Sequence, residues 1–170
     1  MKKLYFVRHG ESVLNVAGLF AGTTDTALTP KGRRQAKRAG AQAKDLKIDL
    51  IISSPLSRAY DTAKIIAKEI GYPKAKIQLN PMLAERNYGS AEGQPYSVDF
   101  NVDGIKDAET VDELLLRAKE VVDSLSRLEA ENVMLVGHGS IGRAIRHHLL
   151  EDYPYHLPER LANAEIVQWI

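Results

Sequence analysis

Short apolar runs alternate with longer amphipathic stretches along this 170-residue chain, and this alternation constrains the fold more than any other feature. The apolar runs have the lengths and residue types of buried strands, and they lie at 4–7, 48–52, 76–79, 132–136 and 165–170. Helical patterns lie between them, at 29–46, 54–71, 110–131 and 141–150. Strands that alternate with helices predict a mainly parallel sheet with helices on both faces, a three-layer α/β/α sandwich.

Local signals mark the starts of the predicted helices. Thr29 is a good N-cap, and Pro30 suits the first helical position. Ser54-Pro55 has the same form at the start of the next helix. Two stretches, 11–28 and 81–108, show no sustained period and predict long loops, which in compact domains tend to be functional.

Composition limits the class of protein. The length fits a single domain spanning 1–170, and the net charge of +1 gives no sign of nucleic-acid or membrane binding. No apolar run has the length of a membrane span, and there is no cysteine to form a disulfide, a thiolate metal site or a nucleophile. We therefore expect a cytoplasmic enzyme that acts without nucleic acid or membrane, and its oligomeric state stays open. The basic helix around 31–44 is interpreted as a solvated face.

Two histidines occupy equivalent places in this pattern. His9 follows the first predicted strand in Arg-His-Gly, and His138 follows the fourth in Gly-His-Gly. Ligands of open α/β sheets bind beyond the carboxyl ends of the strands, so neighbouring parallel strands would bring both imidazoles into one cleft. The glycines beside them would let the backbone approach a ligand closely. A lone histidine is more often structural, but this matched pair favours a functional role.

Two arginines can join the histidines at this edge of the sheet. Arg8 precedes His9, and Arg58 lies near the start of the helix that begins at 54. An arginine near a helix N-terminus suits a phosphate group, because its guanidinium can donate two parallel hydrogen bonds. These residues predict an anion site, but they do not single out a carboxylate, since Glu85 is one of 22 acidic residues.

Five segments in chain order resemble motifs of the phosphoglycerate mutase and histidine phosphatase superfamily. They are Phe6-Val7-Arg8-His9-Gly10-Glu11-Ser12 with Asn15; Gly22, Asp25, Leu28-Thr29, Gly32 and Gln35-Ala36; Ser53-Ser54-Pro55-Leu56-Ser57-Arg58-Ala59 with Thr62; Leu83, Glu85 and Tyr88-Gly89; and Gly137-His138-Gly139 with Arg143. Any one of these motifs is weak evidence. The ordered set, which spans most of the chain, is highly specific.

The resemblance implies a phosphoglycerate mutase-like fold and a role for each matched residue. His9 would be the nucleophile that forms a phosphohistidine, and Glu85 would be the proton donor. The implied catalytic residues are His9, Glu85, His138, Arg8 and Arg58. The residues implied to bind a small phosphorylated metabolite are Arg8, Asn15, Arg58, His138, Ser12 and Thr23. No metal and no cofactor is expected, because the arginines supply the positive charge.

Phosphoryl transfer sets requirements on the two histidines. His9 must attack as a neutral imidazole, and a backbone carbonyl on its other ring nitrogen would fix the tautomer. His138, if protonated, would add a third donor where negative charge accumulates. Glu85 would protonate the leaving alkoxide and then activate water.

Several functions remain compatible with this site. A phosphomonoester hydrolase is favoured over a cofactor-dependent phosphoglycerate mutase, because the segment 89–109 is short and lacks a basic cluster for a second anionic group. A non-catalytic sensor of phosphorylated ligands is a further alternative, since fold alone does not decide function. A zinc hydrolase using His9, His138 and Glu85 is less favoured, because the chain has no short-spaced metal motif.

Overall fold

The computed structural model describes residues 1–96, 101–150, 153–156 and 161–170. Within these ranges the strands are β1 (Lys3–Arg8), β2 (Leu50–Ser53), β3 (Gln78–Leu79), β4 (Asn132–Gly137) and β5 (Ile166–Gln168). The helices are α1 (Val13–Ala17), α2 (Pro30–Gln42), α3 (Ser57–Glu69), α4 (Val111–Leu125) and α5 (Gly139–Leu149). Short 3-10 helices lie at Ala43–Leu46, Lys74–Lys76, Pro81–Leu83, Gly89–Ala91 and Val102–Gly104.

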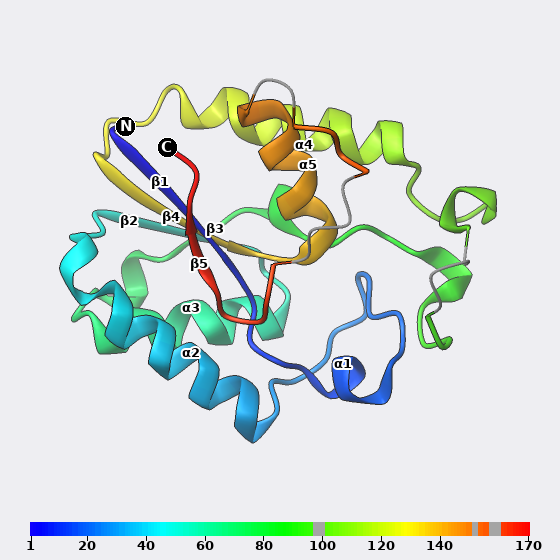
Figure 1. The fold of residues 1–170 in the computed structure, drawn as a ribbon, viewed down its shortest axis with the longest axis horizontal. Coiled ribbons are helices and arrows are strands. Elements are labelled where there is room, and N and C mark those ends of the chain that lie inside the picture. The colour runs from blue at the N-terminus through cyan, green and yellow to red at the C-terminus, as the bar shows by residue number, and fades with distance from the viewer. Residues whose placement is uncertain (97–100, 151–152, 157–160) are drawn as a thin grey trace.

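The strands form one sheet in the order β3-β2-β4-β1-β5, with helices on both of its faces (Figure 1). The first four strands run parallel, whereas β5 pairs antiparallel with β1. Along β1 the side chains alternate between two cores: Leu4 and Phe6 pack beneath α4 and α5, and Tyr5 and Val7 pack beneath α2 and α3. The predicted three-layer α/β/α sandwich with a mainly parallel sheet is confirmed.

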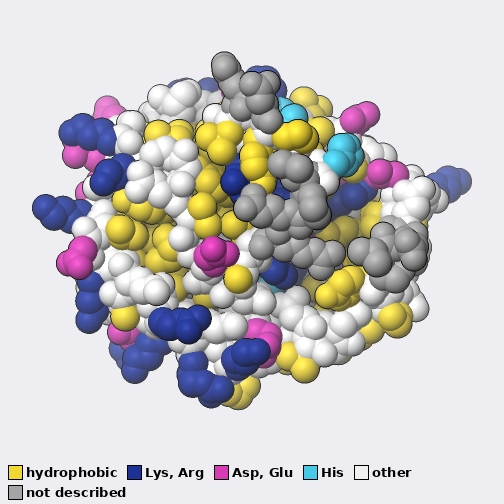
Figure 2. Space-filling view, viewed as in Figure 1, with side chains coloured by type: hydrophobic (Ala, Val, Ile, Leu, Met, Phe, Trp, Pro, Cys, Tyr) yellow, Lys and Arg dark blue, Asp and Glu magenta, His cyan; other side chains and the backbone are white. Residues whose placement is uncertain are grey.

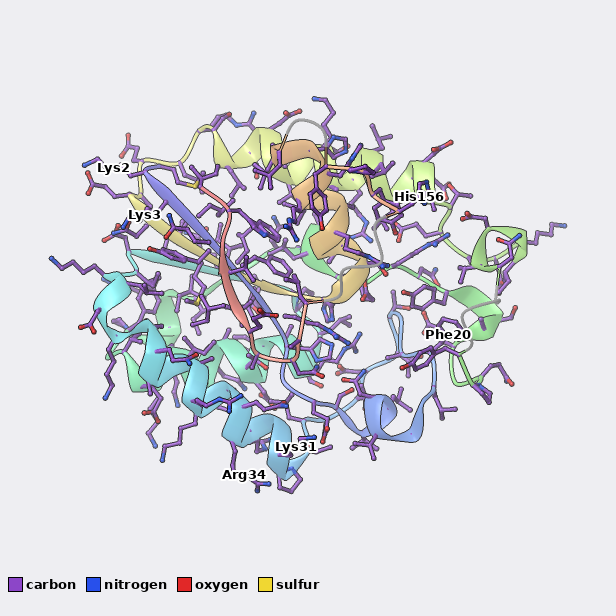
Figure 3. All side chains as sticks on the ribbon, viewed as in Figure 1. Lys2, Lys3, Phe20, Lys31, Arg34 and His156 are labelled. Carbon is purple, nitrogen blue, oxygen red and sulfur yellow. The ribbon has the colours of Figure 1, made fainter. Side chains whose placement is uncertain are left out.

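The carboxyl ends of β1, β2 and β4 lie at the same edge of the sheet. The parallel register pairs Arg8 with Gly137 and Ser53 with Val136, so the residue after each strand emerges beside the others. Figure 3 shows Lys2 and Lys3 at the amino end of β1 and Phe20 on the opposite side of the molecule, beyond the carboxyl ends. This edge is where the sequence predicted a ligand site.

Helix α1 lies inside a stretch that the sequence predicted to be loop only. Ser12 is its N-cap: the Ser12 hydroxyl accepts from the amide of Asn15, and the Asn15 side chain accepts from the amide of Ser12. None of the five residues of α1 is buried, so no hydrophobic period marks the helix in the sequence. Local capping, rather than an apolar face, therefore explains this helix.

Two other helices differ from the prediction at one end. α3 begins at Ser57 rather than at 54, because the amide of Ser57 donates to Asp25 Oδ1 at 2.8 Å across a distant loop. α4 begins after its N-cap Thr110, at the start of the predicted stretch 110–131, but stops at Leu125 instead of near 131. The hydroxyls of Ser124 and Ser126 donate there to carbonyls of the last turn, which weakens a helix.

The basic helix α2 turns its cations to solvent. Its buried residues are Gly32, Ala36, Ala39 and Gly40, so the lysines and arginines occupy the outer face. Lys31 pairs with Glu11 at 2.9 Å, and dark blue side chains lie over α2 in Figure 2 with acidic ones between them. This agrees with the interpretation of a solvated face. Over the residues that the structure describes, no helix is long and apolar enough to cross a membrane.

Candidate active site

The two histidines lie next to each other at the carboxyl edge of the sheet. The backbone amide of His9 donates to Gly137 O at 2.9 Å, which continues the pairing of β1 with β4. The ring centroids of His9 and His138 are 5.1 Å apart, and the ring planes meet at 58°. Both side chains are buried. The structure therefore brings together the two imidazoles that the sequence pattern singled out.

The His9 ring is anchored through its own neighbour. Nδ1 of His9 lies 2.7 Å from Gly10 O, and a carbonyl can only accept, so Nδ1 carries the proton. Nε2 of the neutral ring is left with a lone pair. Burial lowers the pKa of His9 well below its ordinary value of 6.5, and the charges of Arg58 and Arg8 lower it further. The sequence required a backbone carbonyl for this task but could not say which one.

Burial also favours the neutral form of His138 in the free pocket. Burial is the largest cause that lowers its pKa well below 6.5, followed by the charges of Arg58, His9 and Arg8. The sequence analysis considered a protonated His138 as a donor to phosphate. In the free pocket, His138 can instead donate through only one ring N–H. Its Nε2 lies 2.8 Å from Ser54 Oγ, and its Nδ1 has no hydrogen-bond partner among the described residues.

Arg58 is almost completely buried at the start of α3, where 1% of it is exposed. Its Nη1 donates to Thr24 O at 2.9 Å, and its Nη2 donates to Gly22 O at 2.6 Å. Both carbonyls belong to the loop before α2, so this loop sets the orientation of the guanidinium. Nε of Arg58 is buried without a partner in the described part of the chain.

The loop that holds Arg58 is itself held by Glu92, which the sequence analysis did not identify. Its carboxylate accepts from the amides and the hydroxyls of Thr23 and Thr24, at 2.5 to 3.0 Å. Gly22 has a φ of 50°, and a Cβ there would lie 2.1 Å from Glu92 Oε1. A larger residue at position 22 would therefore displace the carboxylate.

The backbone that carries Arg8 and His9 is fixed by residues far along the chain. Asn163 Nδ2 donates to His9 O at 2.9 Å, and the Ala164 amide donates to Arg8 O at 2.8 Å. The side chain of Arg8 donates from Nη1 to Leu161 O at 2.9 Å. The spacing of residues along the sequence does not predict these contacts, because each of them involves a backbone atom, which every residue type has.

Glu85 reaches the same pocket from the loop after β3. Its carboxylate accepts from the amides of Ser140 at 3.0 Å and Ile141 at 3.2 Å, at the N-terminus of α5. It also accepts from the amide of Arg86 at 2.9 Å. The unpaired amides of a helix N-terminus suit a carboxylate, which explains why this acid and not another lies here.

Of the glycines beside the histidines, Gly139 is the one that lines the pocket. A Cβ on Gly139 would lie 3.7 Å from Glu85 Oε2 and 3.9 Å from Arg8 Nε, so this glycine lies in the pocket between the two side chains. A Cβ on Gly10 would instead lie 2.4 Å from Gly32 O, and one on Gly137 would meet the ring of Phe6. These two serve packing rather than access of a ligand.

The remaining predicted substrate contacts lie in three different environments. Asn15 lines the pocket, and its Oδ1 is bonded to Ser12 N. Ser12 itself is fully buried as a helix cap and does not line the pocket, so its position argues against the predicted contact with substrate. Thr23 donates to Glu92 and lines a neighbouring cavity that also borders Glu85, and its predicted role stays a prediction.

The resulting pocket has a volume of about 300 Å³ and carries more positive than negative charge. Its charged lining residues are Arg8, Arg58, Arg86, Arg143 and Glu85. Leu19, Phe20 and Tyr88 form part of an apolar wall, in which the rings of Phe20 and Tyr88 are 5.0 Å apart. Among the described residues, no three His, Asp or Glu side chains gather in a way that could hold a metal ion.

Comparisons with known proteins agree on one family. The family model described as "Histidine phosphatase superfamily (branch 1)" matches residues 4–168. A protein of Erwinia tasmaniensis named "Probable phosphoglycerate mutase GpmB" is 36% identical over 154 residues, which are 82% of this chain and 70% of that protein. "Uncharacterized phosphatase PhoE" of Bacillus subtilis is 33% identical over 168 residues, which are 96% of this chain and 86% of that one. The solved structure of a mycobacterial glucosyl-3-phosphoglycerate phosphatase superposes with a TM-score of 0.83 at 26% identity, over 98% of this chain and 89% of that one.

Proposed function

The chain belongs to the histidine phosphatase superfamily, and from this premise we propose that it is a phosphomonoester hydrolase, built as one domain over 1–170. Its substrate is a small phosphorylated metabolite, and the phosphoryl group passes through a phosphohistidine on His9. The single observation that carries the proposal is the anchoring of His9 Nδ1 on Gly10 O, because it leaves Nε2 as a nucleophile.

In the first step, the lone pair of His9 Nε2 attacks phosphorus. A nitrogen–phosphorus bond forms, and the bond from phosphorus to the ester oxygen breaks. The low pKa of His9 supports this step, because the ring is neutral and able to attack at physiological pH. The anchored ring also loses little freedom when it attacks.

Positive charge stabilises the phosphoryl group as it moves. Arg8 and Arg58 line the pocket, and each guanidinium can donate to more than one phosphoryl oxygen. His138 adds a neutral N–H donor beside them. Asn15 contributes at the pocket edge through its amide nitrogen, since its oxygen is already bonded to Ser12 N. Phosphoryl transfer depends mainly on this kind of positioning and charge stabilisation.

Glu85 supplies and then recovers the proton. The leaving alkoxide takes a proton from the Glu85 carboxyl in the first step. In the second step, water gives a proton to the Glu85 carboxylate while its oxygen attacks phosphorus. The bond to His9 Nε2 breaks, inorganic phosphate leaves, and both side chains return to their starting forms.

The lining of the pocket favours water over a second anionic substrate as the acceptor. Of the described residues between 89 and 109, those that line the pocket are Tyr96 and Val102, and neither carries a charge. Arg86 does line the pocket, but its guanidinium pairs with Asp103 and its Nε donates to Glu109 O at 2.8 Å. A mutase needs a basic cluster that holds the second anionic group of its substrate.

A hydrolysis assay with p-nitrophenyl phosphate and a panel of phosphate esters tests the proposal. We expect release of inorganic phosphate without added metal, and intact-protein mass spectrometry should detect one phosphoryl group on His9. The variant His9→Ala should lose both, with kcat reduced by at least about 10³-fold. His156→Ala is the matched control, because His156 is exposed and lies outside the pocket lining.

The same experiment separates the alternatives. Faster interconversion of 3-phosphoglycerate and 2-phosphoglycerate than release of phosphate would establish a mutase. Binding of phosphate esters without turnover would establish a sensor. Full activity in His9→Ala would remove the phosphohistidine from the mechanism.

A further inference from the structure

Ser54 lies beside the second histidine, and both side chains are fully buried. Ser54 follows β2 and His138 follows β4, which is the neighbouring strand, so the sheet brings them together. Ser54 Oγ and His138 Nε2 are 2.8 Å apart. We propose that Ser54 is a positioning residue: its hydroxyl donates to Nε2 and so keeps the ring proton of His138 on Nδ1.

The other contacts of the Ser54 hydroxyl decide the direction of this hydrogen bond. Ser54 Oγ already accepts from the amide of Leu56 at 3.2 Å. In the part of the chain that the structure describes, His138 Nε2 is the one acceptor bonded to this hydroxyl. If Nε2 carried the proton, two buried groups would have no partner, the Ser54 hydroxyl hydrogen and the lone pair of Nδ1. With the proton on Nδ1, only that N–H has none, and fewer unpaired polar groups away from water are favoured. Nε2 is therefore the acceptor, and the proton of the neutral ring is on Nδ1.

This arrangement leaves Nδ1–H of His138 as the one donor of the ring. The ring is fully buried and is not among the residues that line the pocket, but its centroid lies 5.1 Å from that of the pocket-lining His9, so a phosphoryl group at His9 is the ligand it could reach. Nδ1 is buried and has no hydrogen-bond partner within the described ranges. The charged neighbours of the ring include Arg58 and Arg8, two of the four arginines that line the pocket. Burial, followed by these charges, keeps the pKa of His138 low and the ring neutral. A neutral ring has a single N–H to donate, so its location on Nδ1 decides whether the ring can contact an anion at all.

Both histidines then carry their proton on Nδ1, but they present different groups to a ligand. His9 is anchored through Nδ1–H and offers the lone pair of Nε2, whereas His138 is anchored through Nε2 and offers Nδ1–H. One ring can attack phosphorus while the other donates to a phosphoryl oxygen. This role in catalysis rests on the proposed function. The tautomer of His138 is independent of that function, because it follows from the hydrogen bonds of the ring.

Nitrogen-15 NMR of protein labelled in its five histidines reads the tautomer directly. The signals of His138 are assigned by their loss in His138→Ala. We expect Nδ1 of His138 to be protonated in the wild-type protein, and the proton to move toward Nε2 in Ser54→Ala. The proposal is wrong if His138 is protonated on Nε2 in the wild-type protein, a measurement that needs no variant. It is also wrong if the proton of His138 stays on Nδ1 in Ser54→Ala.

Kinetics test the consequence for catalysis. Ser54→Ala should lower kcat about tenfold to a hundredfold and change KM by less than about threefold, because a donor to the transition state is lost. Ser54→Thr keeps the hydroxyl and should recover most of kcat. Ser53→Ala is the matched control, since Ser53 is equally buried but its hydroxyl donates to Ser54 O.

Two results separate this proposal from the proposed function. If the tautomer switches in Ser54→Ala but the wild-type protein hydrolyses no ester, the proposed function fails and the assignment of Ser54 stands. If Ser53→Ala loses as much kcat as Ser54→Ala while both remain folded in thermal melts, the role of Ser54 is packing and the proposal is wrong.

Discussion

The carboxylate of Glu92 holds the loop that in turn holds the guanidinium of Arg58. Glu92 accepts hydrogen bonds from both threonines of the loop, and the carbonyls of Gly22 and Thr24 accept from Arg58. Burial raises the pKa of Glu92, but hydrogen bonds from Thr24 and Thr23 outweigh it and hold that pKa below the ordinary value. The orientation of the buried Arg58 guanidinium thus depends on the Glu92 carboxylate, which acts through the loop between them.

Replacing Glu92 should impair catalysis through this loop. Glu92→Gln keeps the shape of the side chain but has one oxygen acceptor, so we expect kcat/KM to fall about tenfold and the free energy of unfolding to fall by about 1–3 kcal/mol. Urea unfolding and steady-state kinetics measure the two effects. Glu131→Gln, which removes an exposed pair with Lys2, should change neither. Unaltered kcat/KM in Glu92→Gln would show that the loop holds Arg58 without this carboxylate.

Two glycine substitutions should have opposite effects on stability. In Gly139→Ala the new Cβ meets Glu85 and Arg8 at ordinary contact distances, so the fold should be about 0.5 kcal/mol more stable while kcat/KM decreases. In Gly10→Ala the Cβ collides with Gly32 O, and stability should fall by about 1–3 kcal/mol. Thermal melts and ester hydrolysis test both. A Gly139→Ala variant with full activity would mean that substrate does not use the space beside this glycine.

Stability should decrease as the pH falls below about 6.5. The pKa values of His9 and His138 are depressed in the folded protein, chiefly by burial, whereas the unfolded chain binds protons near the ordinary value of 6.5. The unfolded state therefore gains protons that the native state does not, and each histidine destabilises the fold by up to about 1.4 kcal/mol per pH unit. Urea unfolding between about pH 7.5 and about pH 5.5 measures this slope. Replacing His138 by Gln should make the slope shallower, and an equal slope in that variant would contradict the assignment.

A tetrahedral anion should stabilise the folded protein. Phosphate or vanadate at 100 times its Kd would add about 2.7 kcal/mol to the free energy of unfolding, provided that it binds only the native state. Arg58→Gln should abolish most of this gain, because its guanidinium is the most deeply buried of the arginines that line the pocket. Arg33→Gln on the exposed face of α2 should retain it. Thermal melts with and without the anion give the comparison, and an equal gain in Arg58→Gln would place the anion elsewhere.

The sequence predicted the parts of the site that depend on strands. His9 and His138 were identified because each follows an apolar run whose strand can be recognised locally. Their proximity also requires β1 and β4 to be neighbours. The sequence analysis took this pairing as a condition, and the strand order shows it. The start of α2 at Thr29 was also predictable, because a cap acts within one turn.

The remaining parts could not be predicted from local pattern. Glu85 is held by amides at the start of α5, more than fifty residues away, so composition and spacing did not distinguish it from other acids. Glu92 and Asn163 form hydrogen bonds with backbone atoms of distant segments. The residue types Glu and Asn do not by themselves predict such contacts. The packing of Gly10 against α2 was not predictable, because the sequence does not show that these two segments meet.

Two residues translated late fix the backbone of two residues translated early. Asn163 and Ala164 bond to the carbonyls of His9 and Arg8. Asn163 and His9 are separated by 154 positions. On the ribosome, strand β1 can emerge long before the segment that fixes its carboxyl end has been translated. His9 therefore acquires its final surroundings only after nearly all of the sheet has been translated. A nascent chain that lacks the segment of Asn163 and Ala164 contains His9 but not the hydrogen bonds that fix its backbone.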